Sequence, residues 1–214
     1  MKTLFSIIFF TLTSAFALAQ TTTLGTQVWS TKNLEVTTFR NGDPIFYAQT
    51  DEEWEKAGAN GQAAWSYFEH DPKNEEIYGK LYNWFAVNDP RGLAPEGWKI
   101  PTDGDWAKLI EFLGGKTNAS QKMKSTDLWE NDAANIGAGN NSSGFSGFPG
   151  GYRYGHGGFV NIGKVGYWWS STENDQYTAW SRSLQNFNQS VFRGNYDKGL
   201  GLSVRCLKNE VLTK

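Results

Sequence analysis

Two glycine-lysine runs in the sequence have part of the spacing of a phosphate-binding loop, Gly-x-x-x-x-Gly-Lys-Ser/Thr. The run from Gly158 to Lys164 has both glycines and the lysine, but Val165 stands where the Ser or Thr that binds Mg²⁺ is needed. The run Gly115-Lys-Thr has the second half alone, because Ile110 takes the place of the first glycine. A phosphate-binding loop also opens a helix, whereas the residues after Lys164 are strand-like. We therefore expect no phosphate site in either run.

Residues for nucleophilic or acid–base catalysis are few. Both histidines, His70 and His156, lie in predicted loops, and a triad or a histidine-based zinc site needs more than these. The run Gly144-Phe-Ser-Gly lacks the spacing of a nucleophilic serine elbow. The single cysteine, Cys206, lies on the apolar side of an alternating run, which is typical of a buried hydrophobe rather than a reactive thiol. No catalytic residue is predicted, and an enzyme that uses loop carboxylates on a polysaccharide stays an alternative, because the spacing that matters there is spatial.

Two oxygen-rich clusters on predicted loops could hold calcium, which takes six to eight oxygen ligands. They are Trp129-Glu-Asn-Asp132 and Glu173-Asn-Asp175. Asn and Asp also form turns through bonds to their own backbone, and this is the more common role. We expect no cofactor, with a structural calcium ion at these clusters as the alternative.

Aromatic side chains beside polar turns are the better indication of function. Ligand sites combine apolar walls with a few placed polar groups, and sugars are bound by aromatic faces together with amide, carboxylate and guanidinium groups. The predicted ligand-binding residues are Trp129, Asn131, Asp132, Asn141, Tyr152, Tyr154, His156 and Tyr196. They favour a non-catalytic binding or adhesion module for a glycan or an extracellular protein. The alternative is that these rings complete the core of a loop-rich domain, and a structural component of an envelope or matrix is a third possibility.

Two helices must position these loops. Thr50 and Glu53 form a capping box at the start of one, which Gly58 ends. Thr102 begins the other, and Trp106 opens an apolar stripe at helical spacing that closes before a Gly-Gly pair. Residues 59–80 are predicted to form an exposed loop, and residues 81–87 are compatible with either a strand or a helix.

Strands are predicted at residues 27–30 and 34–39 and through the C-terminal third, residues 166–206, which we expect to form the central sheet. Trp168, Trp169 and Trp180 are predicted core residues there. Three arginines recur on these last strands and need partners if they are buried. The arginines are Arg182, Arg193 and Arg205, and the predicted partners are Glu173 and Asp197.

The composition and the N-terminal residues indicate in which cellular compartment the protein acts and which classes of partner it does not bind. The chain has 214 residues, a net charge of −2, one cysteine, 24 glycines and 10 tryptophans. This balance gives no basic surface for nucleic acid and no polybasic patch for a membrane. Residues 1–19 have the pattern of a signal peptide, and residues 20–214 fit one domain. We expect a secreted protein, extracellular or periplasmic, without a membrane anchor; its oligomeric state is not predicted.

Seven short motifs stand in order along the chain. They are Trp29…Asn33-Leu34, Tyr78-Gly-Lys-Leu-Tyr-Asn-Trp84, Gly97-Trp-Lys-Ile-Pro-Thr102, Asn141-Ser-Ser-Gly-Phe145, Pro149-Gly-Gly-Tyr-Arg153, Gly166-Tyr-Trp-Trp-Ser-Ser-Thr-Glu173 and Ser203-Val-Arg-Cys206. With these motifs the chain resembles the Fibrobacter succinogenes major paralogous domain family from about residue 25 to residue 206. The resemblance implies an extracellular bacterial domain with an α+β, C-type lectin-like fold: two helices packed on short antiparallel strands, with a long loop region for ligands.

Formylglycine-generating enzymes and animal C-type lectins share that implied fold, but their functional residues are missing here. One cysteine provides neither the paired cysteines of copper-dependent oxidation nor the lectin disulfides. The Glu-Pro-Asn tripeptide that binds calcium in lectins is also absent. The resemblance therefore implies neither activity for this chain.

Overall fold

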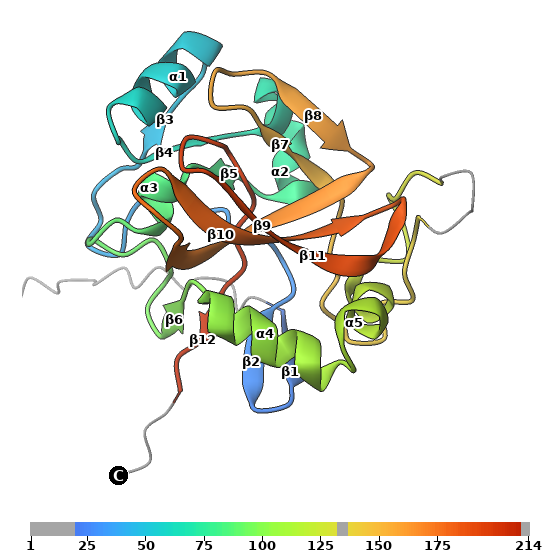
Figure 1. Ribbon diagram of the computed structural model, residues 1–214. Helices are drawn as coiled ribbons and strands as arrows, with labels where there is room; N and C mark the ends of the chain where they lie inside the picture. Colours follow the sequence, from blue (N-terminus) through green and yellow to red (C-terminus); the bar gives the residue numbers. More distant parts are fainter. Residues whose placement is uncertain (1–19, 132–136, 211–214) are drawn as a thin grey trace, which may run out of the picture.

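The computed structural model of the protein describes residues 20–131 and 137–210 and consists mainly of three β-sheets (Figure 1). The strand orders are β1-β2-β12-β6, β11-β10-β9-β7-β8 and β3-β4-β5. The strands are β1 (Thr21–Leu24), β2 (Gln27–Ser30), β3 (Phe46–Tyr47), β4 (Ala64–Ser66), β5 (Leu81–Tyr82), β6 (Trp98–Lys99), β7 (Gly150–Arg153), β8 (Phe159–Ile162), β9 (Val165–Glu173), β10 (Thr178–Gln185), β11 (Asn188–Asp197) and β12 (Leu207–Lys208). Because β12 lies between β2 and β6, the four-stranded sheet joins the two ends of the described chain.

Short helices surround these sheets. They are α1 (Asp51–Ala59), α2 (Glu75–Tyr78), α3 (Trp84–Val87), α4 (Asp103–Phe112) and α5 (Lys116–Met123), with 3₁₀ turns η1 (Phe68–His70) and η2 (Pro72–Asn74). The predicted capping box at Thr50 and the predicted helix start at Thr102 are confirmed: the Thr50 and Thr102 hydroxyls each accept a backbone N–H three residues on, at 3.1 Å. Within the described ranges, no helix is long and apolar enough to cross a membrane. The predicted signal peptide, residues 1–19, lies outside the described residues.

The five-stranded sheet separates two hydrophobic cores. Successive side chains of a strand point to opposite faces, so Trp168 and Trp169 of β9 enter different clusters. Trp169 packs with residues of β4, β5 and α3, whereas Trp168 packs with Trp106 and Leu109 of α4. Both tryptophans of β9 are fully buried, which confirms the prediction that they are core residues. Trp180 is only partly buried, so that part of the prediction is wrong.

The segment after β11 connects all three sheets. Residues 201–203 form isolated bridges to Arg153 of β7, Tyr82 of β5 and Trp168 of β9, and Leu207 then enters the four-stranded sheet. The alternating Leu202, Val204 and Cys206 side chains are buried in one core. Burial raises the pKa of the Cys206 thiol to about 12, so the thiol is protonated at neutral pH, as expected for a structural residue.

The predicted α+β, C-type lectin-like fold with two helices is wrong, because the structure is mostly β-sheet and its helices are short. The predicted loop at residues 59–80 contains β4, η1, η2 and α2. Residues 34–39 form no strand; Thr38 makes one isolated bridge to Pro44. Residues 81–87 contain both open alternatives, β5 followed by α3. Helix α5 was not predicted because its glycine N-cap and polar surface give no apolar stripe.

Candidate functional site

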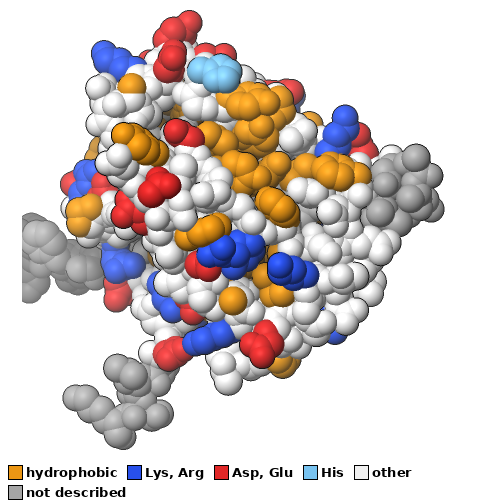
Figure 2. Space-filling model, in the orientation of Figure 1, with side chains coloured by type: hydrophobic (Ala, Val, Ile, Leu, Met, Phe, Trp, Pro, Cys, Tyr) orange, Lys and Arg blue, Asp and Glu red, His pale blue; other side chains and the backbone are white. Residues whose placement is uncertain are grey.

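Four tyrosines and a histidine form a continuous surface on the five-stranded sheet, which we call the tyrosine face. Tyr167 lies edge to face with Tyr152 at 5.1 Å between ring centroids and with Tyr196 at 5.8 Å. Tyr152 contacts Tyr154 at 5.0 Å, and His156 stacks on Tyr154 at 5.1 Å. In Figure 2, hydrophobic side chains, a colour class that includes tyrosine, gather over β7, β8 and β9.

Strand register explains why these rings meet. Gly151 of β7 lies opposite Gly166 of β9, so the next residues, Tyr152 and Tyr167, lie side by side. Tyr196 comes from β11, with β10 between it and β9. On this face β10 carries only small side chains, Ala179, Ser181 and Ser183, all buried. Because these side chains are short, rings from β9 and β11 can meet above them.

Gly194 makes room for two neighbouring rings on β11. A Cβ at this position would lie 2.9 Å from Cε2 of Tyr196 and 3.1 Å from Cε1 of Phe192. Phe192 is 48% exposed and lies at the edge of the tyrosine face. A larger residue than glycine would push these rings apart, so the edge of the face depends on Gly194.

Three of the tyrosine hydroxyls, those of Tyr152, Tyr167 and Tyr196, are neutral hydrogen-bonding groups. Burial raises the pKa of Tyr167 to about 12, and it also raises the pKa of Tyr152 and of Tyr196. These hydroxyls therefore stay protonated at neutral pH and can donate as well as accept hydrogen bonds. Tyr154 is 37% exposed, and Tyr152 and Tyr196 are partly exposed. The face therefore joins apolar rings to the neutral hydroxyls of Tyr152, Tyr167 and Tyr196.

The β7–β8 hairpin that carries Tyr154 and His156 is anchored to helix α1. Asp51, at the first position of α1, accepts hydrogen bonds from Arg153 Nη2 at 2.9 Å and from Gly158 N at 3.2 Å. Arg153 is fully buried and also donates to the carbonyl oxygens of residues 48 and 50. The hydrogen bond from Arg153 lowers the pKa of Asp51, so this carboxylate stays ionised at neutral pH. The hairpin is therefore fixed at its tip.

The structure brings together four of the eight predicted ligand-binding residues: Tyr152, Tyr154, His156 and Tyr196. Trp129 is buried in the core that contains Trp168, where its Nε1 donates to Ser125 Oγ at 3.0 Å. Asn141 holds its own loop through bonds to the Ser146 backbone and hydroxyl.

The remaining two predicted residues lie next to each other in the chain. Asn131 is exposed, and Asp132 lies outside the described residues. Tyr167 and Phe192 were missed by the sequence analysis. For Tyr167 the signal was its spacing, because it lies two residues before Trp169 and therefore points to the same face.

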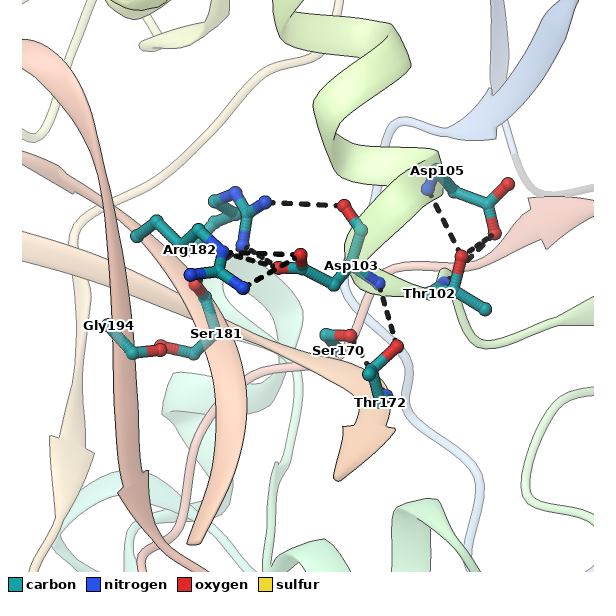
Figure 3. Close-up of polar contacts among 9 residues, drawn as sticks. Thr102, Asp103, Asp105, Ser170, Thr172, Ser181, Arg182 and Gly194 are labelled. Carbon is teal, nitrogen blue, oxygen red and sulfur yellow. Dashed lines mark hydrogen bonds and ion pairs between the residues drawn. The ribbon is translucent and has the colours of Figure 1, made fainter. Parts of the chain in front are cut away.

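A second group of polar side chains lies where α4 meets β10 and β11 (Figure 3). Arg182 Nη1 donates to Asp103 Oδ1 at 2.6 Å, and Arg193 Nε donates to the same oxygen at 3.0 Å. Burial opposes ionisation of Asp103, but the hydrogen bonds from Arg193 and Arg182 outweigh it and lower its pKa. The predicted partners, Glu173 and Asp197, are wrong for these arginines; Glu173 pairs with Lys198 instead.

The third arginine is fully buried and is bound by neutral oxygens. Arg205 Nε donates to Asn33 Oδ1 at 2.6 Å, and its other nitrogens donate to the backbone oxygens of Ser30, Phe145 and Ser146. Asn33 Oδ1 also accepts from Trp168 Nε1 at 2.8 Å. These residues belong to motifs that are far apart in the sequence. The motifs that meet at Arg205 therefore build part of the interior.

The described residues give no support for a metal site. Residues 20–131 and 137–210 contain no group of three His, Cys, Asp or Glu side chains that could hold a metal ion. At the predicted cluster 173–175, Asp175 Oδ1 accepts the backbone N–H groups of Tyr177 and Thr178 at 2.8 Å, as a turn-forming residue does. The other predicted cluster includes Asp132, outside the described residues.

The fold and this site define a class: a mostly β protein whose largest sheet carries a face of four tyrosines, of which Tyr167 is buried and the other three are at least partly exposed. The sequence comparison gives the family. Residues 22–208 match the Fibrobacter succinogenes major domain, and the chain belongs to that family. Comparisons of this chain with the curated proteins and with the solved structures found no match.

Proposed function

We propose that the chain is a non-catalytic binding module that takes a glycan on the tyrosine face. The observation that supports this most directly is the continuous contact of four tyrosine rings and one histidine ring on one sheet surface. Each of these rings joins an apolar surface to a polar atom. A sugar has the matching features, since it presents apolar C–H groups and many hydroxyls.

The ring geometry favours the end or a short stretch of a glycan chain. Neighbouring tyrosines lie at 73° to 89° to each other, so they form a stepped surface rather than a flat platform. A flat crystalline polysaccharide would need coplanar rings. A stepped surface of rings and hydroxyls instead fits a ligand whose own surface is uneven, such as the end of a glycan chain.

A catalytic role is less well supported at this place. Glycoside hydrolysis needs a pair of carboxyl groups, one of which acts as a protonated acid. Asp51, the carboxylate that contacts the hairpin, is bound by Arg153 and its pKa is lowered, which is the wrong direction for an acid at neutral pH. Secretion, which would give this module access to extracellular glycans, remains a prediction from residues 1–19.

Glycan-array screening of the purified protein, followed by calorimetry with the best ligand, tests the proposal. Tyr154→Ala should weaken binding at least about tenfold, which corresponds to about 1.4 kcal/mol. Tyr154→Phe, which keeps the ring and loses the hydroxyl, should give an intermediate loss. Phe112→Ala is the matched control, because Phe112 is a 57% exposed aromatic residue on α4. Its binding should equal that of the wild type.

Two results would overturn the proposal. One is the absence of any glycan ligand together with a protein partner whose binding Tyr154→Ala abolishes; interfaces between proteins are also enriched in tyrosine. The other is a glycan whose affinity is the same for Tyr154→Ala and for the wild type.

A further inference from the structure

A cavity of about 440 Å³ lies between α4, the start of α5 and strands β10 and β11. Ala107, Ile110 and Val191 give it an apolar wall, and Arg182, Arg193 and Lys116 are its basic lining residues. We call it the arginine cavity. On β10, Arg182 alternates with Ser181 and Ser183, so it points away from the tyrosine face. Figure 2 shows basic side chains gathered between β11 and α4.

The arginines at this cavity outnumber their carboxylate partner. Arg182 and Arg193 both bind Asp103, at 2.6 and 3.0 Å, and within the described residues neither forms an ion pair with a second acid. Arg182 is 3% exposed, and its buried Nε has no hydrogen-bond partner in the structure as described. Arg193 is 41% exposed and lies over the Trp180 ring at 3.2 Å from its centroid. The cluster therefore carries one excess positive charge.

The remaining charged lining residues do not cancel this excess. Glu111 and Lys116 are both exposed and of opposite sign, so their charges offset each other. Gly115, which also lines the cavity, is the N-cap of α5 and has no side chain to cap the first N–H groups. The positive end of this helix adds to the attraction for an anion.

A second cavity of the molecule provides an internal comparison. It has about 450 Å³ and is lined by Arg91, which is 40% exposed and lies over the Phe39 ring at 4.1 Å. Arg91 binds two carboxylates, Asp43 at 3.2 Å and Asp89 at 2.9 Å. One arginine with two acids leaves a negative excess, whereas two arginines with one acid leave a positive excess. Of these two cavities, the arginine cavity combines a positive excess with an apolar wall and the other does not.

We propose that the arginine cavity binds a small organic carboxylate. Its head group would accept hydrogen bonds from Arg193, the accessible arginine, and its hydrocarbon part would lie against Ile110 and Val191. Charge-assisted hydrogen bonds to guanidinium groups are the strong ones in proteins, and the apolar wall selects an organic anion over an inorganic one. The site is separate from the tyrosine face and does not depend on the proposed glycan ligand.

Titration of the full-length protein with hexanoate, hexanamide and inorganic phosphate tests this site, with binding followed by calorimetry and by amide NMR shifts. Hexanoate should bind tightest and weaken as salt is raised, because its head group is charged. Hexanamide has the same hydrocarbon part without the charge, and phosphate has charge without the hydrocarbon part. Binding of hexanamide or of phosphate as tightly as hexanoate would overturn the proposal.

Four variants locate the site. Arg193→Gln should weaken hexanoate binding at least about tenfold, whereas Arg91→Gln, the matched control, should leave it unchanged. Ala107→Phe should block the cavity without removing a charge, because Ala107 is exposed on α4 and lines the cavity. Lys108→Phe, at the neighbouring exposed position, should not block it. Wild-type affinity in both Arg193→Gln and Ala107→Phe would place hexanoate elsewhere and refute the assignment.

Discussion

Asn33 and Arg205 lie far apart in the sequence but meet in the interior. The Asn33 side chain accepts hydrogen bonds from Arg205 and Trp168 through Oδ1 and donates to the Tyr78 backbone oxygen at 2.7 Å. A fully buried guanidinium is tolerated only when its donors are satisfied, and backbone oxygens near Phe145 complete the set. These contacts give a physical reason for five of the seven family motifs, which contribute Asn33, Tyr78, Phe145, Trp168 and Arg205 to a single buried polar network.

Asp103 allows a test at the level of one residue. Its pKa is lowered in the folded protein, so it contributes stability above the unfolded pKa of about 4, and this contribution is lost as pH falls through the folded value. Asp103→Asn removes the partner of buried Arg182 and should cost roughly 3 kcal/mol at pH 6. The difference from the wild type should shrink toward pH 2.

Urea unfolding at several pH values between 6 and 2 measures this difference. Glu111→Gln is the control, since Glu111 is exposed on the same helix and forms no ion pair within residues 20–131 and 137–210. Its unfolding free energy should follow that of the wild type at every pH. A difference for Asp103→Asn that stays constant down to pH 2 would show that the carboxylate charge does not stabilise the fold.

At the scale of elements, local sequence patterns predicted the starts of helices correctly, but they did not predict which distant residues contact each other. The helix starts at Thr50 and Thr102 are each encoded within four residues, and both helices begin where they were predicted to begin. The partner of Arg182 and Arg193 lies 79 and 90 residues away, on the first turn of α4, and no local pattern indicates it. The meeting of Tyr167 with Tyr196 likewise depends on the register of three strands.

The β7–β8 hairpin gives a test at this scale, because two adjacent glycines share a left-handed backbone and differ in surroundings. Gly157 has φ of +93° and Gly158 has φ of +71°. A Cβ on Gly157 would lie 2.3 Å from Asp51 Cβ, whereas a Cβ on Gly158 would meet nothing within 4 Å. Both alanine variants carry the left-handed penalty of about 1–2 kcal/mol. Gly157→Ala should cost about 1 kcal/mol more, because Asp51 must move.

Urea unfolding of the two alanine variants measures that difference directly. If Asp51 anchors the hairpin, Gly157→Ala should also weaken any ligand of the tyrosine face more than Gly158→Ala does, since Tyr154 and His156 lie on this hairpin. Equal losses of stability for the two variants would show that the close approach to Asp51 does not restrict the hairpin.

At the scale of the whole molecule, residues 201–207 connect the three sheets, and this predicts how the protein unfolds. Leu202 is 1% exposed, packs in the core with Trp169, and exchanges backbone hydrogen bonds with Tyr82 at 2.9 and 3.1 Å. Leu202→Ala should cost roughly 2–5 kcal/mol, as for other buried leucines. Leu200→Ala, at a partly buried position against the same core, should cost less.

Because the three sheets share this segment, the whole protein should unfold in one transition. Tryptophan fluorescence and far-UV circular dichroism should therefore show the same fall in the unfolding midpoint of Leu202→Ala. A fall in the fluorescence midpoint alone would mean that the sheets unfold independently, and that the C-terminal segment packs on the core without coupling them.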